Sequence, residues 1–241
     1  MIRLTAKGID VNMDFDIKNH AVVNIGGLEL WITDTIVNTW IIMGVLIVFA
    51  VIVRIKLKKF SDVPKGFQNV VEMMVEAFDG FLRSTVGGKL MFLGNWFFTV
   101  FAFVLISNIS GLFTLRPPTA DWAFTIAIAL VTFFLIQILA IRYRGRAYLK
   151  SFLEPFFLFL PLNILGEIAR PISLSFRLYG NILSGTIIMS LIYTITPLFV
   201  RFVIPAALHA YFDVFAGLLQ TYIFCALSLS FINSAAVSET E

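Results

Sequence analysis

The sequence predicts an all-α integral membrane protein with about five transmembrane helices and one amphipathic surface helix. Of its 241 residues, 59% are hydrophobic and only 14% are charged, whereas a soluble domain carries roughly 25% charged residues. Several charge-free runs approach or exceed the ~20 residues that a helix needs to cross a bilayer core of about 30 Å. The charged residues gather in the short segments between these runs. The net charge of +3 is too small to indicate a nucleic-acid partner.

The first third of the chain predicts a tail, one span and the surface helix. Residues 1–34 mix acidic and basic side chains without the apolar core of a signal peptide, so we expect a short polar tail outside the membrane. Residues 35–55 form the first predicted span. Residues 64–84 place apolar side chains at helical spacing, begin with a proline suited to a first helical turn, and have an acidic polar face.

The acidic face indicates where this surface helix lies. A helix that lies on a membrane usually has a lysine-rich polar face. We therefore expect residues 64–84 to pack on neighbouring helices at the cytoplasmic surface. A re-entrant segment is the alternative.

The remaining two thirds predict two ordinary spans and a long hairpin. Residues 91–115 and 121–143 are the spans, and residues 152–196 and 202–237 are the arms of the hairpin, with Pro197 and Pro205 bracketing its turn. Residues 162–196 alone would extend about 52 Å as a helix. The first arm must therefore tilt steeply, kink at Pro171 or extend into the cytoplasm, and we favour a strongly tilted hairpin.

Basic residues predict the orientation, because short loops rich in lysine and arginine stay cytoplasmic. Four basic residues follow each of the first and third spans: Arg54, Lys56, Lys58 and Lys59, then Arg142, Arg144, Arg146 and Lys150. The other connections carry one basic residue each. With five spans, this pattern places the N-terminus outside and the C-terminus in the cytoplasm.

Arg177 is the most informative polar residue of the long hairpin. It precedes 23 charge-free residues, 178–200, and an arginine at membrane depth indicates function by default. Its guanidinium stays protonated, so it supplies a fixed positive charge rather than a proton. On a helix with 3.6 residues per turn, one polar face holds Asn163, Glu167, Arg170, Arg177 and Asn181.

The alternative is a structural arginine that pairs with Glu167. Ten residues along a helix separate the two by about 15 Å, whereas Arg170 lies at the i+3 position of Glu167 and can pair with it. Arg177 is then left without an evident partner on its own helix.

The last predicted helix carries a second polar face with His209, Asp213 and Gln220. Asp213 lies one turn from His209, and together they could pass protons near neutral pH. The alternative is that the two side chains only hydrogen-bond each other and close the hairpin. Two histidines cannot build an HExxH zinc site and the chain has no Gly-x-Ser-x-Gly elbow, so we expect neither a catalytic residue nor a metal or cofactor.

Two sequence runs resemble a known family. The run PLNILGEIARPISLSFRLYGNILSG, residues 161–185, and the run LLQTYIFCALSLSFI, residues 218–232, are similar to subunit a of the F-type rotary ATP synthase. The order of segments agrees over nearly the whole chain. The RLxGN motif inside a membrane helix is specific, and the glutamine of the final helix adds to it.

This resemblance implies a non-catalytic stator subunit in a bacterial plasma membrane. Its partners are then the c-ring, the b subunits of the peripheral stalk and the rest of the complex. In the family, the arginine of RLxGN, here Arg177, faces a ring carboxylate, and Asn181 follows one turn later. Two offset half-channels load and unload protons or sodium ions on the ring, and Gln220 matches the family's glutamine near the arginine.

The resemblance also assigns the two half-channels. Glu167 and Asn163 fall on the inner path, and Asp213 on the outer path. Thr186 departs from the pattern, because many members have glutamate or histidine there. Either Asp213 alone serves the outer path, or water and hydroxyls do, or the ion is sodium.

Two other functions stay open from the sequence. A free-standing antiporter would use Arg177 and Asp213 as its exchange site. A scaffold would need Arg177 for structure alone.

Overall fold

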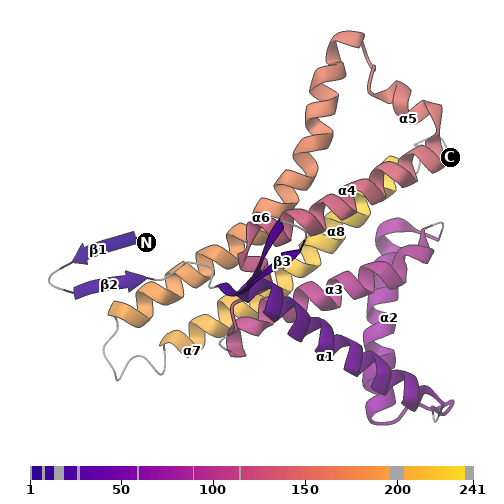
Figure 1. The fold of residues 1–241 in the computed structure, drawn as a ribbon. Helices are drawn as coiled ribbons and strands as arrows, with labels where there is room; N and C mark the ends of the chain where they lie inside the picture. The colour runs from indigo at the N-terminus through magenta and orange to yellow at the C-terminus, as the bar shows by residue number, and fades with distance from the viewer. Residues whose placement is uncertain are drawn as a thin grey trace.

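Helices dominate the computed structural model, which describes residues 2–6, 9–13, 19–25, 28–58, 60–88, 90–113, 115–195 and 204–236. Within these ranges, five helical segments are long and apolar enough to cross a membrane: residues 34–57, 91–113, 122–144, 157–194 and 204–236. This confirms the predicted fold class. Figure 1 shows the long helices running side by side, with α2 lying across one end of the bundle.

Two β-hairpins precede the helices, where we had expected only a polar tail. Strand β1 (Ile2–Ala6) pairs with β2 (Ile9–Met13), and β3 (Asn19–Ile25) pairs with β4 (Leu28–Thr33), both antiparallel. Two glycines separate β3 from β4 in the sequence, a composition typical of a two-residue hairpin connection. The composition of residues 1–34 did not reveal these strands.

The first span, α1 (Asp34–Leu57), leads to α2 (Phe67–Val86). Helix α2 begins three residues after Pro64, and glycines with positive φ, Gly66 and Gly87, flank its two ends, where other residues would be strained. It packs on α3 (Gly94–Ile109) and α8 (Gly217–Ala236) through buried Phe78 and Leu82. Packing on neighbouring helices agrees with its acidic outer face.

The core lies between α3, α4 (Trp122–Arg144) and α8. Phe97 of α3, Ile136 of α4 and Phe224 of α8 are fully buried there. Helix α8 is the most enclosed span, whereas the apolar side chains of α1 are mostly exposed. Side chains of α1 therefore face lipid or another protein.

Helix α6 (Leu160–Ile195) continues through Pro171 without interruption. Its 36 residues make it about 54 Å long, beyond the ~30 Å of a bilayer core. Proline has no N–H to donate to the carbonyl four residues earlier, here that of Glu167. Figure 1 shows α6 changing direction along its length.

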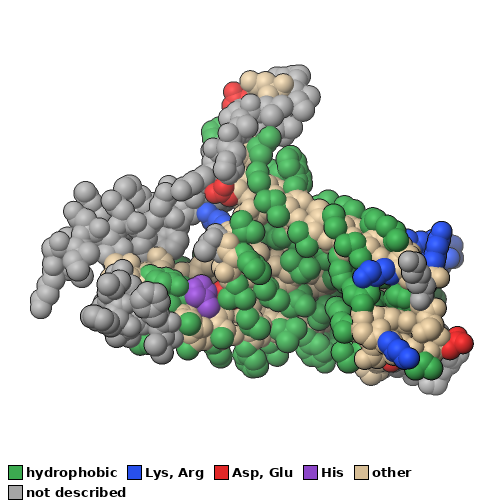
Figure 2. Space-filling view, turned by 90° about the horizontal axis from the view of Figure 1, so that it is seen from below, with side chains coloured by type: hydrophobic (Ala, Val, Ile, Leu, Met, Phe, Trp, Pro, Cys, Tyr) green, Lys and Arg blue, Asp and Glu red, His purple; other side chains and the backbone are tan. Residues whose placement is uncertain are grey.

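The return arm of the hairpin combines α7 (Ile204–His209), a π-helical stretch (Ala210–Ala216) and α8. The short helix α5 (Arg146–Ser151) follows α4 and leads toward α6. In Figure 1 the C-terminal ends of α1 and α4, with basic residues in their last turns, lie at the same end of the bundle. Figure 2 shows lysine and arginine side chains gathered at that end, with hydrophobic side chains covering the middle.

Candidate functional site

Arg177 lies near the middle of α6, 17 residues after Leu160 and 18 before Ile195 (177 − 160 and 195 − 177). Its side chain is exposed, and it forms no hydrogen bond or ion pair with the residues that the structure describes. Ser175, two residues earlier, is fully buried and bonds Thr125 of α4 through their hydroxyls at 3.1 Å. Two residues turn a helix by about 200°, so Arg177 points away from the bundle.

Several small residues lie on the face of α6 that carries Arg177. Gly166, Ser173, Gly180 and Ser184 share its face of α6 by helical spacing. A Cβ atom added at either glycine would meet no atom within 4 Å. The described part of this chain therefore leaves this face of α6 uncovered, and small residues let another helix approach closely.

Asn181 and Gly185 fix the register between α6 and the return arm. The Asn181 amide donates to the backbone carbonyl of Ala216 at 3.5 Å, and a Cβ at Gly185 would lie 3.4 Å from Phe212. Because the two arms are antiparallel, Arg177, four residues before Asn181, and Gln220, four residues after Ala216, fall at the same level. Gln220 is buried, and its amide nitrogen has no hydrogen-bond partner among the described residues.

His209 and Asp213 meet beside the π-helical stretch. His209 Nδ1 lies 2.5 Å from Asp213 Oδ2, and His209 Nε2 lies 3.0 Å from the hydroxyl of Tyr193 near the end of α6. The Asp213 carboxylate also lies against Gly111, where an added Cβ would be 3.3 Å from its oxygens. The three side chains form a continuous chain of proton donors and acceptors.

The π-helical stretch changes one expectation from the sequence. An uninterrupted α-helix would carry His209, Asp213 and Gln220 on one face, but residues 210–216 have wider turns. His209 and Asp213 still meet, whereas Gln220 is buried in the first turn of α8. Thr186 donates its hydroxyl to the Leu183 carbonyl of its own helix at 2.8 Å.

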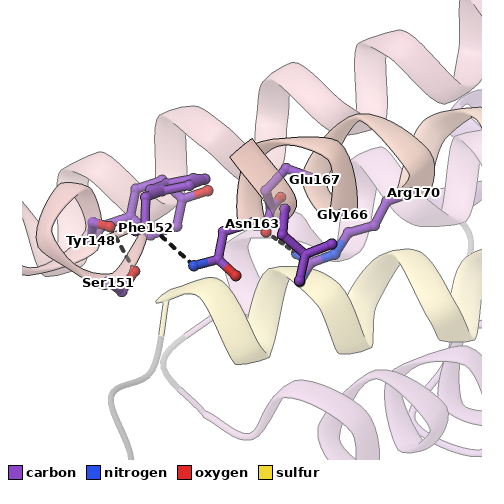
Figure 3. Close-up of a pocket in the computed structure, with 8 residues that line it drawn as sticks. Tyr148, Ser151, Phe152, Asn163, Gly166, Glu167 and Arg170 are labelled. Atoms are coloured by element: carbon purple, nitrogen blue, oxygen red, sulfur yellow. Dashed lines mark hydrogen bonds and ion pairs between the residues drawn. The ribbon is translucent and has the colours of Figure 1, made fainter. Parts of the chain in front are cut away.

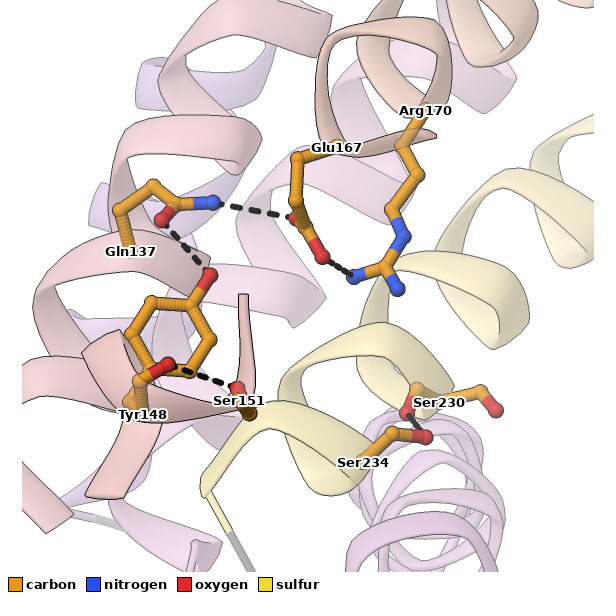
Figure 4. Close-up of polar contacts among 7 residues, drawn as sticks. All are labelled: Gln137, Tyr148, Ser151, Glu167, Arg170, Ser230 and Ser234. Carbon is orange, nitrogen blue, oxygen red and sulfur yellow. Dashed lines mark hydrogen bonds and ion pairs between the residues drawn. The ribbon is translucent and has the colours of Figure 1, made fainter. Parts of the chain in front are cut away.

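Glu167 and Arg170 lie on the same helix, ten and seven residues before Arg177. Arg170 Nη1 lies 2.8 Å from Glu167 Oε1, which confirms the predicted i+3 pair. The second carboxylate oxygen accepts from the amide of Gln137 in α4 at 3.2 Å, and Gln137 accepts from the Tyr148 hydroxyl at 2.8 Å (Figure 4). Both oxygens of Glu167 are therefore held by donors.

A pocket of about 380 Å³ opens between α5 and α6 beside this group (Figure 3). Glu167, Arg170 and Asn163 line it on the α6 side, and Tyr148 on the α5 side. The Asn163 amide is engaged with backbone, because it donates to the carbonyls of Phe152 and Glu154 at 2.9 and 3.1 Å. Burial, and secondarily the Glu167 charge, raises the pKa of Tyr148 above its usual 10.0.

A third polar group was not evident from the sequence. Asn108 of α3 is fully buried and donates to the Gly217 carbonyl at 3.0 Å and the Thr221 hydroxyl at 3.1 Å. It accepts from the Thr119 hydroxyl at 2.8 Å. These bonds join α3 to the start of α8 just after the π-helical stretch.

The predicted site residues thus form three levels along the hairpin. Asn163, Glu167 and Arg170 lie together at one level, Arg177, Asn181 and Gln220 at the next, and His209 and Asp213 beyond them. Tyr148, Gln137 and Tyr193 join these groups through contacts that helical spacing does not predict. Among the described residues, no group of three His, Cys, Asp or Glu side chains could hold a metal ion.

Comparison with known proteins identifies the family of this chain. Residues 36–233 match the family model described as ATP synthase A chain. The chain is 34% identical over 213 residues to ATP synthase subunit a of Moorella thermoacetica, covering 88% of this chain and 93% of the relative. It is 37% identical over 213 residues to ATP synthase subunit a 2 of Bradyrhizobium sp., covering 86% and 90%.

A further relative is named for its ion. The chain is 34% identical over 228 residues to the sodium ion specific ATP synthase subunit a of Propionigenium modestum, covering 85% of this chain and 74% of the relative. The chain therefore belongs to the family of ATP synthase A chains, the non-catalytic, multi-pass a subunits of the F-type membrane sector.

Proposed function

We propose that this chain is the ion-conducting stator subunit of its complex, with Arg177 facing the carboxylates of a rotating c-ring. The observation that carries the proposal is the position of Arg177: mid-helix, exposed, unpaired within the described chain, and on a helix face with several small residues. A charge at membrane depth is costly unless an opposite charge meets it. A ring carboxylate supplies that charge from outside the chain.

The depth of Arg177 supports a mid-membrane contact. It shares its level with Gln220, which lies 16 residues from either end of the last span (220 − 204 and 236 − 220). Both residues therefore lie near the middle of their membrane spans. A carboxylate at the centre of a partner helix would meet them there.

The polar groups on either side of this level suggest two half-channels. Glu167 lies ten residues from Arg177, about 15 Å along α6, and Asp213 lies seven residues from Gln220, about 10 Å in the opposite direction along the hairpin. Glu167, with Asn163 and Arg170, serves the inner path. Asp213, with His209, serves the outer path. The fixed charge of Arg177 between them opposes direct passage of a cation.

Ion flow drives rotation because a ring site moves through lipid only when it is neutral. The ion enters by the outer path, neutralises a ring carboxylate, travels round with the ring and leaves by the inner path, where Arg177 receives the bare carboxylate. Each charge that crosses 100 mV yields about 2.3 kcal/mol, so several ions per turn supply the cost of ATP synthesis.

We propose protons as the ion, with sodium as the second candidate. The chain from Tyr193 through His209 to Asp213 consists of groups that exchange protons. Thr186 bonds within its own helix, which favours Asp213 with His209 as the outer path over a role for the Thr186 hydroxyl. Sodium remains a candidate because one relative is named sodium ion specific.

Our proposal also gives the orientation of the chain in its membrane and its partner subunits. The basic ends of α1 and α4 support a cytoplasmic location for that end of the bundle, with the N-terminus outside and the C-terminus inside a bacterial plasma membrane. We place the c-ring against the Arg177 face of α6. The b subunits of the peripheral stalk and the rest of the complex complete the set of partners.

Vesicles that bear the whole complex test this function. Glu167→Gln and Asp213→Asn are each expected to slow ATP-driven ion flux in assembled complexes. Native flux in both variants would remove the two carboxylates from the path. Ion flux by the chain alone, without a ring, would favour the free-standing antiporter.

A further inference from the structure

Side chains of α4 and α5 form a chain of hydrogen bonds that ends at Glu167. Gln137 of α4 donates to Glu167 Oε2, and Tyr148 of α5 bonds the far end of the Gln137 amide. Gln137 and Glu167 are 30 residues apart in the chain, and Tyr148 follows Gln137 by 11. Three helices therefore meet at one carboxylate beside the pocket (Figures 3 and 4).

The chemistry of these groups fixes the direction of each bond. An ionised carboxylate only accepts, so the NH₂ group of Gln137 must face Glu167. The amide oxygen then faces Tyr148, whose hydroxyl donates. A tyrosine hydroxyl can also accept, so the amide can turn over when Glu167 is protonated: its oxygen accepts from the carboxyl O–H while its NH₂ donates to Tyr148.

Burial and an aromatic contact restrain Tyr148. Its side chain is only 5% exposed, and its ring meets Phe152 edge-on with centroids 5.1 Å apart. On the other side of the carboxylate, the Arg170 guanidinium lies 5.1 Å from the ring centroid of Phe231 in α8. Aromatic contacts thus restrain Tyr148, which bonds Gln137, and Arg170, which pairs with the carboxylate.

We propose that Tyr148 and Gln137 are positioning residues that hold the Glu167 carboxyl at the pocket in both of its protonation states. This inference rests on the proposed function of Glu167 in the inner half-channel. The pair keeps the carboxyl aligned while a proton arrives and leaves, because the Gln137 amide can keep one bond to the carboxyl and one to Tyr148 at either stage. The other charges near this group are Arg170 on α6 and Arg144 of α4, which acts on the Tyr148 hydroxyl.

The test is a double-mutant cycle on ATP-driven pumping by the whole complex in vesicles, with rates normalised to assembled complex. Tyr148→Phe keeps the ring and removes the hydroxyl, and it is expected to slow pumping about five- to tenfold, the effect of one lost hydrogen bond. In a Glu167→Gln background, the same change is expected to leave the rate unaltered, because its effect acts through the carboxyl.

The test also includes a second variant and a matched control. Gln137→Leu is expected to reproduce the effect of Tyr148→Phe, and it carries the test if the Tyr148 variant fails to assemble. Ser151→Ala is the matched control, since Ser151 lines the same pocket but bonds only the Tyr148 backbone carbonyl. The control is expected to pump at the native rate.

A pH profile separates positioning from mere packing. Gln137 donates to the carboxylate and Tyr148 supports Gln137, so losing either side chain disfavours the ionised form of Glu167. The pumping rate is measured against the pH on the ATP side. In Tyr148→Phe and Gln137→Leu, its fall at alkaline pH is expected to move to higher pH. Native pumping in both variants, or equal slowing with and without Glu167, overturns the proposal. Native pumping in Glu167→Gln alone would instead overturn the proposed role of Glu167.

Discussion

Asp213→Asn is the substitution for which the structure gives the clearest magnitude. The change keeps the size of the side chain and its ability to accept from His209 Nδ1, now at 2.5 Å from Oδ2. A hydrogen bond to a charged group contributes about 1.5–3 kcal/mol and a neutral bond about 0.5–1.5. The loss is therefore about 1–1.5 kcal/mol, which corresponds to about a tenfold change in a rate or equilibrium constant.

The expected result follows from that loss. ATP-driven proton pumping should fall about tenfold or more, because the asparagine cannot take up a proton and its bond to His209 is weaker. The amount of assembled complex should stay near native, since the side chain still accepts one bond. The assay compares acidification of vesicles per unit of assembled complex, measured with a pH indicator.

A matched control isolates the carboxyl group. Thr186→Val removes a hydroxyl at the position where the family resemblance predicts glutamate or histidine, but among the described residues this hydroxyl bonds only the Leu183 carbonyl of its own helix. It should pump at close to the native rate. Native pumping by Asp213→Asn, or equal losses in the two variants, would refute the assignment of the outer path to Asp213.

The other predictions concern neighbouring groups. Tyr193→Phe removes the 3.0 Å contact to His209 and is expected to slow outer-side proton entry about two- to fivefold, measured as the lag in synthesis after an acid jump. Glu167→Gln should slow flux while passive leakage stays at the native level, because Arg177 still separates the two paths; a leak in unenergised vesicles would argue otherwise. The raised pKa of Tyr148 predicts that its hydroxyl ionises above 10.0, so its contribution to stability is present below that pH and lost as the pH rises past it. Ultraviolet difference titration of native and Tyr148→Phe protein measures this, and ionisation at or below 10.0 would contradict it.

Local contacts of the site were predictable from the sequence. The Glu167–Arg170 pair spans three residues and the His209–Asp213 pair spans four, and helical geometry alone brings such neighbours together. The five spans followed from charge-free runs, because a bilayer imposes length and apolarity on each helix. The missing partner of Arg177 also followed from helical spacing.

Contacts between helices were not predictable in this way. The bonds from Gln137 to Glu167 and from Tyr193 to His209 join separate helices, and helical periodicity carries no information on which side chains meet across an interface. The π-helical stretch depends on how the return arm packs against α3 and α6. Likewise, α6 continues through Pro171 because packing on α4 and α8 outweighs the lost backbone bond.

In the proposed function, Arg177 supplies the charge that a ring carboxylate meets. The most direct test of this role is ATP-driven ion pumping, followed with both pH and sodium indicators, in vesicles that bear the whole complex with native Arg177 or Arg177→Ala. We expect the variant to assemble and to pump nothing, and the indicator that responds with native protein identifies the ion. Coupled pumping at the native rate by Arg177→Ala would contradict the account and leave the arginine a structural role.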